Sequence, residues 1–251
     1  MPAYGVLGPD PNKQLFAAFA PTTTEKQLPR NVSYDYLAGP ILNQLRQGTC
    51  VTFASLSIVF GVLTKRLYPA AAPDMSEAAL YAMTKLNRET SNIQQQGLYV
   101  QDALWVLENM GYVLSKDRPY KDDASYILEP VPADIVHTDH EIKGFQRVGG
   151  NELGNDALNL AMQLALFEKG PLAIGIEFQL DWEGTGPDGI MTPKPIRGNA
   201  GGHETGLWGY SMSKRAYRMR NSWGTDWADH GWSWLSFDSV NFIDDVYTIG
   251  I

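Results

Sequence analysis

Cysteine is almost absent from this sequence, because Cys50 is the only one among 251 residues. A single thiol excludes an intramolecular disulfide and a zinc site built from several cysteines, so its role is either packing or chemistry. Charged residues are also scarce, at 19% against about 25% in typical soluble domains. The 28 acidic side chains outnumber the 20 basic ones, which gives a net charge of -8. This charge repels phosphate backbones and anionic lipids, so we expect neither nucleic acid nor a membrane as a partner.

Long hydrophobic runs are also missing. No segment reaches the roughly 18 consecutive apolar residues that a membrane-spanning helix needs. The first residues, MPAYGVLGPDPNKQ, contain no basic segment followed by an apolar one, so they do not form a recognisable secretion signal. We therefore expect a cytoplasmic or virion-associated protein. The sequence also lacks internal repeats, which excludes solenoids and propellers.

The composition predicts a well-packed globular fold. Hydrophobic residues make up 44% of the chain and aromatic residues 11%, and a chain of this length buries a substantial core without disulfides. Apolar residues at helical spacing predict helices over 50–68, 77–87, 100–109 and 155–169, and the first of these is apolar on every face. Alternation and turn residues predict strands over 172–178, 205–210, 216–221 and 232–237. The class is therefore α+β.

The order of these elements predicts two halves. Residues 1–27 contain several prolines and form an extended N-terminal extension, and residues 28–251 form the folded unit. Within this unit, about 45–140 is mainly helical and about 141–251 is mainly β-structure. Ligand-binding clefts favour such junctions, so we expect the chemistry in the groove between the halves.

Four residues with complementary chemistry occur in separate stretches of the chain. Cys50 opens the first helix, where the positive end of the helix dipole lowers the pKa of a thiol. His203 supplies an imidazole that can form an ion pair with the thiolate and then protonate the leaving amine. Asn221 can orient that ring through its second nitrogen. Gln44 can donate to an oxyanion together with the Cys50 backbone N–H.

The arrangement of these residues resembles the papain-like cysteine peptidases. The order Gln, Cys, His, Asn, the six-residue step from Gln44 to Cys50, the glycines before His203 and the NSWGTDW block all match. The resemblance runs from about Leu28 to the end, and it is closest to compact bacterial and viral-type members without disulfides. It implies a two-domain fold with a helical left domain, a β-barrel-like right domain and a cleft between them.

The resemblance also implies roles for residues around the four. Trp223 would shield the hydrogen bond between His203 and Asn221 from water. Gly97 and Gly202 would bind the backbone of a polypeptide substrate. The family's usual pattern is altered at three positions, where Val51 follows the cysteine, Gln96 precedes Gly97 and Glu204 follows the histidine. A carboxylate at position 204 either raises the pKa of the imidazole or points to the other face of the strand.

Other motifs have simpler explanations. The stretch His137–Glu141 contains metal-capable side chains but no complete ligand set, so we interpret it as an exposed turn and expect no metal. Residues 184–189 match G-x-G-x-x-G, but Pro187 and the missing helix argue against a nucleotide site, and no cofactor is expected. Lys214, Arg215, Arg218 and Arg220 are interpreted as a hairpin tip and the solvent face of one strand.

The sequence therefore predicts a cysteine endopeptidase or exopeptidase that cleaves polypeptides through a Cys50 acyl-enzyme. Two alternatives remain open. One is an amidase or transferase that acts on cell-wall peptides or a conjugated modifier. The other is a catalytically silent component of a larger assembly, or an enzyme whose site is blocked by residues 181–199 or by the N-terminal extension. An assembly partner or inhibitor cannot be named from these residues.

Overall fold

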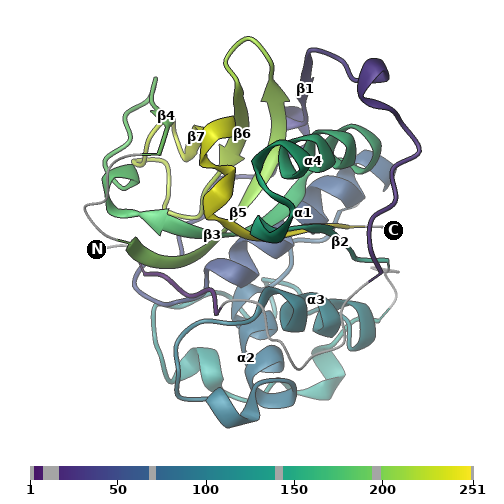
Figure 1. The fold of residues 1–251 in the computed structure, drawn as a ribbon. Coiled ribbons are helices and arrows are strands. Elements are labelled where there is room, and N and C mark those ends of the chain that lie inside the picture. The colour runs from purple at the N-terminus through teal and green to yellow at the C-terminus, as the bar shows by residue number, and fades with distance from the viewer. Residues whose placement is uncertain (1–2, 8–16, 68–71, 139–143, 194–198, 250–251) are drawn as a thin grey trace.

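A computed structural model describes residues 3–7, 17–67, 72–138, 144–193 and 199–249, which form an α+β fold (Figure 1). Helix α1 (Cys50–Leu67) lies between the strands and two further helices, α2 (Glu77–Asn87) and α3 (Val100–Asn109). Helix α4 (Asn155–Lys169) lies against the sheet away from α2 and α3. The bounds of α2, α3 and α4 equal those predicted from the sequence, and α1 agrees over its described residues.

The apolar character of α1 on every face explains its central position, because only a buried helix has neighbours on all sides. Its side chains are buried from Cys50 to Val62 apart from a few that are partly exposed. Gly61 lets the helix approach the sheet closely, since a Cβ atom there would lie 2.4 Å from the Trp208 ring. This contact sets the distance between α1 and the sheet.

Local signals mark where the other helices begin and end, as expected. The side chain of Ser76 accepts a hydrogen bond from the Ala79 backbone N–H and so caps α2. Gly111 follows α3 with a φ of 96°, and Gly170 follows α4 with a φ of 112°, a region that favours glycine.

The strands form one sheet in the order β2-β8-β3-β5-β6-β7-β4, and β1 also pairs with β5. Among the described residues the sheet is open at both ends, so the predicted barrel-like half is an open sheet. All pairings are antiparallel except that of β4 with β7. The strands are β1 (Asn31–Ser33), β2 (Gln146–Gly149), β3 (Leu172–Gln179), β4 (Ile190–Met191), β5 (Asn199–Ser211), β6 (Ala216–Arg220), β7 (Trp232–Ser236) and β8 (Ile243–Thr248).

Strand β5 has the most neighbours and carries His203. It pairs with β3, where His203 lies opposite Ile176, and with β6, where Gly206 lies opposite Arg220. The sequence predicted only its second half, because the glycines before His203 hide the alternation. Strands β1, β2, β4 and β8 were not predicted, because the first three are short and β8 carries two aspartates.

The buried apolar residues form two clusters. One surrounds α1, α2 and α3 and includes Ile58 and Leu104. The other lies between α4 and the sheet and includes Phe178 and Tyr217. The division into halves at about residue 140 remains a prediction. Within the described part of the chain, no helix has the length and apolar character that crossing a bilayer requires.

Candidate active site

Cys50 is the first residue of α1, so its position at the helix start is as predicted. The loop before it turns through Gly48 and Thr49, and the Thr49 carbonyl accepts from the Thr52 hydroxyl and backbone N–H. The Cys50 side chain is 0% exposed and forms no disulfide. The α1 N-terminus therefore presents the thiol inside the protein rather than at its surface.

His203 and Asn221 come from neighbouring strands and meet directly. His203 lies in β5 and Asn221 follows the last residue of β6, so pairing of these strands brings the two side chains together. His203 Nε2 lies 2.7 Å from Asn221 Oδ1, and both residues are buried. The other ring nitrogen, Nδ1, has no hydrogen-bond partner among the described residues.

Trp223, which the family resemblance assigns as a shield for this pair, packs against the imidazole. The centroid of its ring lies 4.9 Å from that of His203, with 40° between the planes. Phe178 approaches the imidazole from β3 at 5.3 Å, edge to face. An apolar shell around the hydrogen bond from His203 to Asn221 strengthens it, because little water competes for either partner.

Gln44 lies in the same site and is held by side chains that sequence analysis did not single out. Ser222 donates its hydroxyl to Gln44 Oε1 at 2.6 Å, and its backbone N–H donates to Asn221 Oδ1 at 2.8 Å. Because the amide oxygen of Gln44 is engaged, its Nε2 group is the donor that faces the site. Ser222 belongs to the NSWGTDW block and directly follows Asn221. This position is the sequence signal that could have identified it as a residue of the site.

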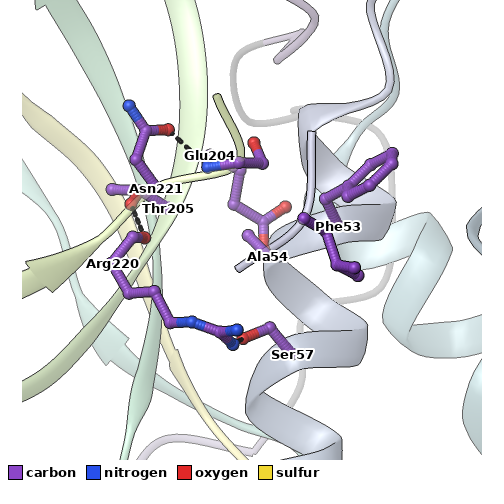
Figure 2. Close-up of a pocket in the computed structure, with 9 residues that line it drawn as sticks. Phe53, Ala54, Ser57, Glu204, Thr205, Arg220 and Asn221 are labelled. Carbon is purple, nitrogen blue, oxygen red and sulfur yellow. Dashed lines mark hydrogen bonds between the residues drawn. The ribbon is translucent and has the colours of Figure 1, made fainter. Parts of the chain in front are cut away.

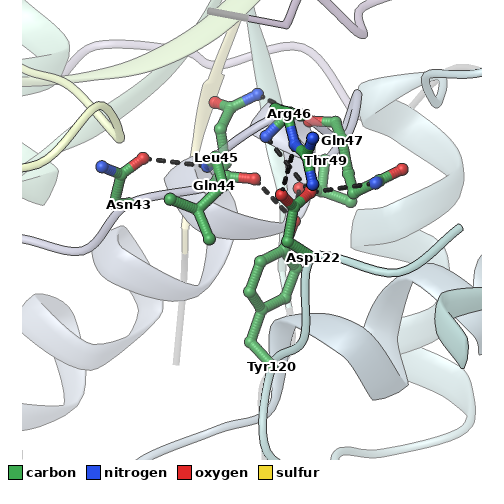
Figure 3. Close-up of polar contacts among 8 residues, drawn as sticks. All are labelled: Asn43, Gln44, Leu45, Arg46, Gln47, Thr49, Tyr120 and Asp122. Carbon is green, nitrogen blue, oxygen red and sulfur yellow. Dashed lines mark hydrogen bonds and ion pairs between the residues drawn. The ribbon is translucent and has the colours of Figure 1, made fainter.

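The loop that carries Gln44 is anchored from the far side (Figure 3). Arg46 donates to Asp122 Oδ2 at 2.7 Å, and Gln47 donates to Asp122 Oδ1 at 3.0 Å. The hydroxyl of Tyr120 donates to the Gln44 carbonyl at 2.7 Å. These contacts hold the backbone of the loop, while Ser222 holds the side chain.

Residues 3–7 of the chain lie across this site. Gln44 Nε2 donates to the Ala3 carbonyl at 2.9 Å. The Gly202 carbonyl accepts from Gly5 N at 3.1 Å, and Leu98 N donates to the Gly5 carbonyl at 2.7 Å. Gly202 and the segment at Gly97, which were predicted to bind a substrate backbone, therefore contact the chain's own residues here.

Burial shifts the pKa values of the central pair. Burial raises the pKa of the Cys50 thiol to about 12, although hydrogen bonds from the Glu204, Gly5 and Val51 backbone oppose the shift. Burial also lowers the pKa of His203 to about 4, against the opposing effect of its bond to Asn221. Burial therefore favours the neutral thiol and the neutral imidazole, because the charged forms lose their hydration, and the thiolate and imidazolium pair stays a prediction.

Glu204 points toward α1 (Figure 2), on the face of β5 opposite to the side chain of its neighbour His203, which decides between the two alternatives for this residue. Its carboxyl group accepts from the Ser55 hydroxyl of α1 at 2.9 Å and is fully buried. Arg220 lies on the same face of the sheet and donates to Ser57 and to the Gly39 carbonyl. The prediction that Arg220 faces solvent is wrong, because α1 covers that face.

A groove of about 560 Å³ adjoins the site beyond Trp223. Its charged residues are three carboxylates and one guanidinium, and that guanidinium, Arg46, is bound to Asp122. The groove is consequently acidic, with aromatic walls. It is lined by Asn43, Leu45, Arg46, Asp122, Glu183, Trp223, Asp226 and Trp227.

Only part of segment 137–141, which carries metal-capable side chains, lies among the described residues. His137 stacks on the Tyr112 ring at 5.3 Å, and His140 and Glu141 lie outside the described residues. Among the residues that are described, no three His, Cys, Asp or Glu side chains form a group suited to a metal.

Comparisons with known proteins agree with this geometry. The papain family of cysteine proteases matches over residues 29–245, so the chain belongs to that family. Cysteine proteinase 3 of Entamoeba histolytica is 26% identical, with 90% of this chain and 70% of that protein covered. Cysteine proteinase 1 of the same organism is 27% identical, and this chain spans 62% of its length.

Solved structures show the same fold. Xylellain, a cysteine protease from Xylella fastidiosa, superposes with a TM-score of 0.77 at 21% identity, over 99% of this chain and 96% of that one. The bromelain protease from Ananas comosus, solved with the inhibitor E64, superposes with a TM-score of 0.69 at 18% identity, over 89% and 100%. The papain-like fold predicted from the motifs is confirmed.

Proposed function

We propose that this chain hydrolyses peptide bonds with Cys50 as nucleophile and His203 as general acid and base. The observation that carries the proposal is the hydrogen bond from His203 Nε2 to Asn221 Oδ1. It commits one ring nitrogen to orientation and leaves Nδ1 for proton transfer. Membership of the papain family supports polypeptides as the substrate class.

The groups supply each step of the reaction. His203 Nδ1 takes the thiol proton, and Cys50 Sγ attacks the carbonyl carbon, whose electron pair moves onto oxygen. Gln44 Nε2 and the Cys50 backbone N–H donate to that oxyanion. The intermediate collapses to a thioester as His203 protonates the departing amine. Water, deprotonated by His203, then releases the acid and restores the thiol.

The supporting residues keep these groups aligned. Asn221 accepts from the Nε2–H of His203, which leaves Nδ1 as the basic nitrogen of the neutral ring. Ser222 holds the Gln44 amide in the orientation that presents its donor, since the oxygen accepts from the serine hydroxyl. Loss of either contact would let the donor or the base rotate, and orientation errors of this kind lower the rate without removing a reacting group.

Hydrolysis of a fluorogenic peptide by single variants tests the proposal. Cys50→Ala removes activity, because no nucleophile remains. His203→Ala lowers kcat by about 10²–10⁴, and Gln44→Ala lowers it by about 10²–10³. We expect a smaller loss for Asn221→Ala, since it orients rather than transfers the proton.

The control is His137→Ala, because that imidazole stacks on Tyr112 away from the site. It is expected to keep full activity. Activity that survives Cys50→Ala or His203→Ala at the level of the intact chain would contradict the assignment. Peptide-bond products that appear only with an added amine acceptor would instead favour a transferase.

A further inference from the structure

We propose that Glu204 is a positioning residue for the reaction: its carboxyl group binds Ser55 of α1 and so holds the part of β5 that carries His203 against the helix that begins with Cys50. This inference rests on the proposed function, because the alignment of a nucleophile with a base matters only if the two react together. Glu204 is also one of the positions at which the sequence departs from the family's usual pattern, and the resemblance assigns no role to its side chain.

The carboxyl group of Glu204 joins the two elements that supply the nucleophile and the base. Neighbouring residues of a strand face opposite sides, so Glu204 extends toward α1 (Figure 2) while His203 faces Asn221. Ser55 lies in α1 five residues after Cys50 and donates its hydroxyl to Glu204 Oε1 at 2.9 Å. Ser55 and Glu204 are both 0% exposed, so little water competes for this hydrogen bond.

The backbone of Glu204 makes a second contact, with the thiol itself. It hydrogen-bonds the Cys50 sulfur, and this contact opposes the rise in the pKa of the thiol that burial causes. Glu204 is thus bound to α1 at two points, the sulfur of the first residue and the hydroxyl of Ser55. Two attachments fix both the distance and the direction of the strand relative to the helix. A shift of β5 on α1 would move the imidazole of His203 relative to the sulfur, and a misplacement of about 1 Å can cost about a hundredfold in rate.

A carboxyl group without charge suits this contact. Burial raises the pKa of Glu204 well above its usual value, against the opposing effect of the Ser55 hydroxyl. Because Oε1 accepts from Ser55, the proton resides on Oε2, which has no hydrogen-bond partner among the described residues. A negative charge here would hinder the nucleophile, since burial raises the pKa of Cys50 and a charge on Glu204 raises it further. A neutral amide of the same shape is therefore expected to replace the carboxyl group.

The charged groups around Glu204 leave its bond to Ser55 as the contact to test. Among the described residues, the titratable side chains that line its cavity or interact with its charge are Cys50 of α1, Arg220 of β6 and Tyr247 of β8. The guanidinium of Arg220 donates to Ser57 and to the Gly39 carbonyl, which are separate partners. The hydrogen bond between Glu204 and Ser55 can therefore be removed from either side while those contacts remain.

The experiment measures kcat and KM for a fluorogenic peptide in the full-length chain and its variants, per folded protein as determined by urea denaturation. We expect Glu204→Ala and Ser55→Ala to lower kcat by about tenfold to a hundredfold and to keep KM within about twofold, because they misalign the reacting groups without touching the substrate. Glu204→Gln is expected to rescue kcat. The double alanine variant is expected to be no slower than Glu204→Ala, since both changes remove one shared contact. Glu25→Ala is the control, because Glu25 is exposed.

The alkylation rate of Cys50 by iodoacetamide at pH 6, measured in the same proteins, separates this inference from the function on which it rests. Alkylation is expected to slow in both alanine variants, because an imidazole aligned with the sulfur promotes its ionisation. If the unaltered chain cleaves no peptide, the proposed function fails and the alkylation rates alone decide the role of Glu204. Alanine variants that react at the rate of the unaltered chain would overturn that role, and so would a Glu204→Gln protein as slow as Glu204→Ala.

Discussion

Glu204 and Arg220 each stand one position from a residue of the site and therefore face the opposite side of the sheet. Both are buried against α1, where Ser55 and Ser57 donate to and accept from them. Oε2 of Glu204 and Nε of Arg220 are buried without a hydrogen-bond partner among the described residues, and both residues line the same small cavity (Figure 2). Burial raises the pKa of Glu204 well above its usual value.

This shift predicts the pH dependence of a variant. Above the usual carboxyl pKa of 4.5, the unfolded chain ionises Glu204 while the folded chain keeps it protonated, so the free energy of unfolding falls as pH rises. Glu204→Gln cannot ionise. Its stability relative to the unaltered chain is expected to increase between pH 4.5 and 7, by up to about 1.4 kcal/mol per pH unit.

Urea denaturation across this pH range measures the difference. The control is Glu25→Gln, because Glu25 is exposed and its replacement is expected to leave the pH profile unchanged. Parallel stability curves for Glu204→Gln and the unaltered chain would show that the buried carboxyl ionises in the folded protein.

Residue types and spacing predicted which side chains form the site, but they did not predict the charge of those side chains. Gln44, His203 and Asn221 converge through Ser222 and the pairing of β5 with β6, and Cys50 opens α1 as the motif placed it. The charge of Cys50 and His203 could not be read from the motifs, since it depends on solvent exclusion by residues distant in the sequence. Their catalytic roles remain predictions until the variants are measured.

The helices were predicted with accurate bounds, whereas the sequence did not predict strands β1, β2, β4 and β8. Helix ends carry local signals such as Ser76, Gly111 and Gly170, which act over a few residues. Short strands such as β1 and β4 exist only because β5 and β7 offer them pairing partners. Such pairing is a long-range property, and a segment of two or three residues has no period of its own.

The contact between Gly61 and Trp208 yields a prediction for α1. Gly61→Ala would improve helix propensity by about 1 kcal/mol. Its Cβ would nevertheless lie 2.4 Å from a ring atom of the fully buried Trp208. We expect overpacking to dominate and to lower the free energy of unfolding by roughly 1–3 kcal/mol.

The midpoint of urea unfolding tests this expectation. Gly184→Ala serves as the matched control, because a Cβ atom there meets no neighbour within 4 Å. A Gly61→Ala protein as stable as the control would mean that Trp208 does not set the distance between α1 and the sheet.

At the scale of the whole molecule, the fold brings a site together from both ends of the chain. Ala3 and Gln44 are near the start, whereas Gly202 lies in β5 and Asn221 directly follows β6. The sequence indicated a two-part fold with a groove, and it left open a site covered by the N-terminal extension. It could not show which residues of that extension reach the cleft, because isolated backbone contacts leave no pattern in side chains.

The central claim is that the uncovered cleft pairs a Cys50 thiolate with a protonated His203. The most direct test uses Gly5→Val, in which a Cβ atom would lie 2.1 Å from the Gly48 carbonyl oxygen and so displaces residues 3–7 from the site. The alkylation rate of Cys50 by iodoacetamide at pH 6 in this variant is compared with that of the same protein unfolded in urea. The account predicts faster alkylation in the folded protein, and loss of that advantage when His203→Ala is added, because only the paired thiol is ionised at this pH. A folded protein that reacts no faster than its unfolded chain would contradict it.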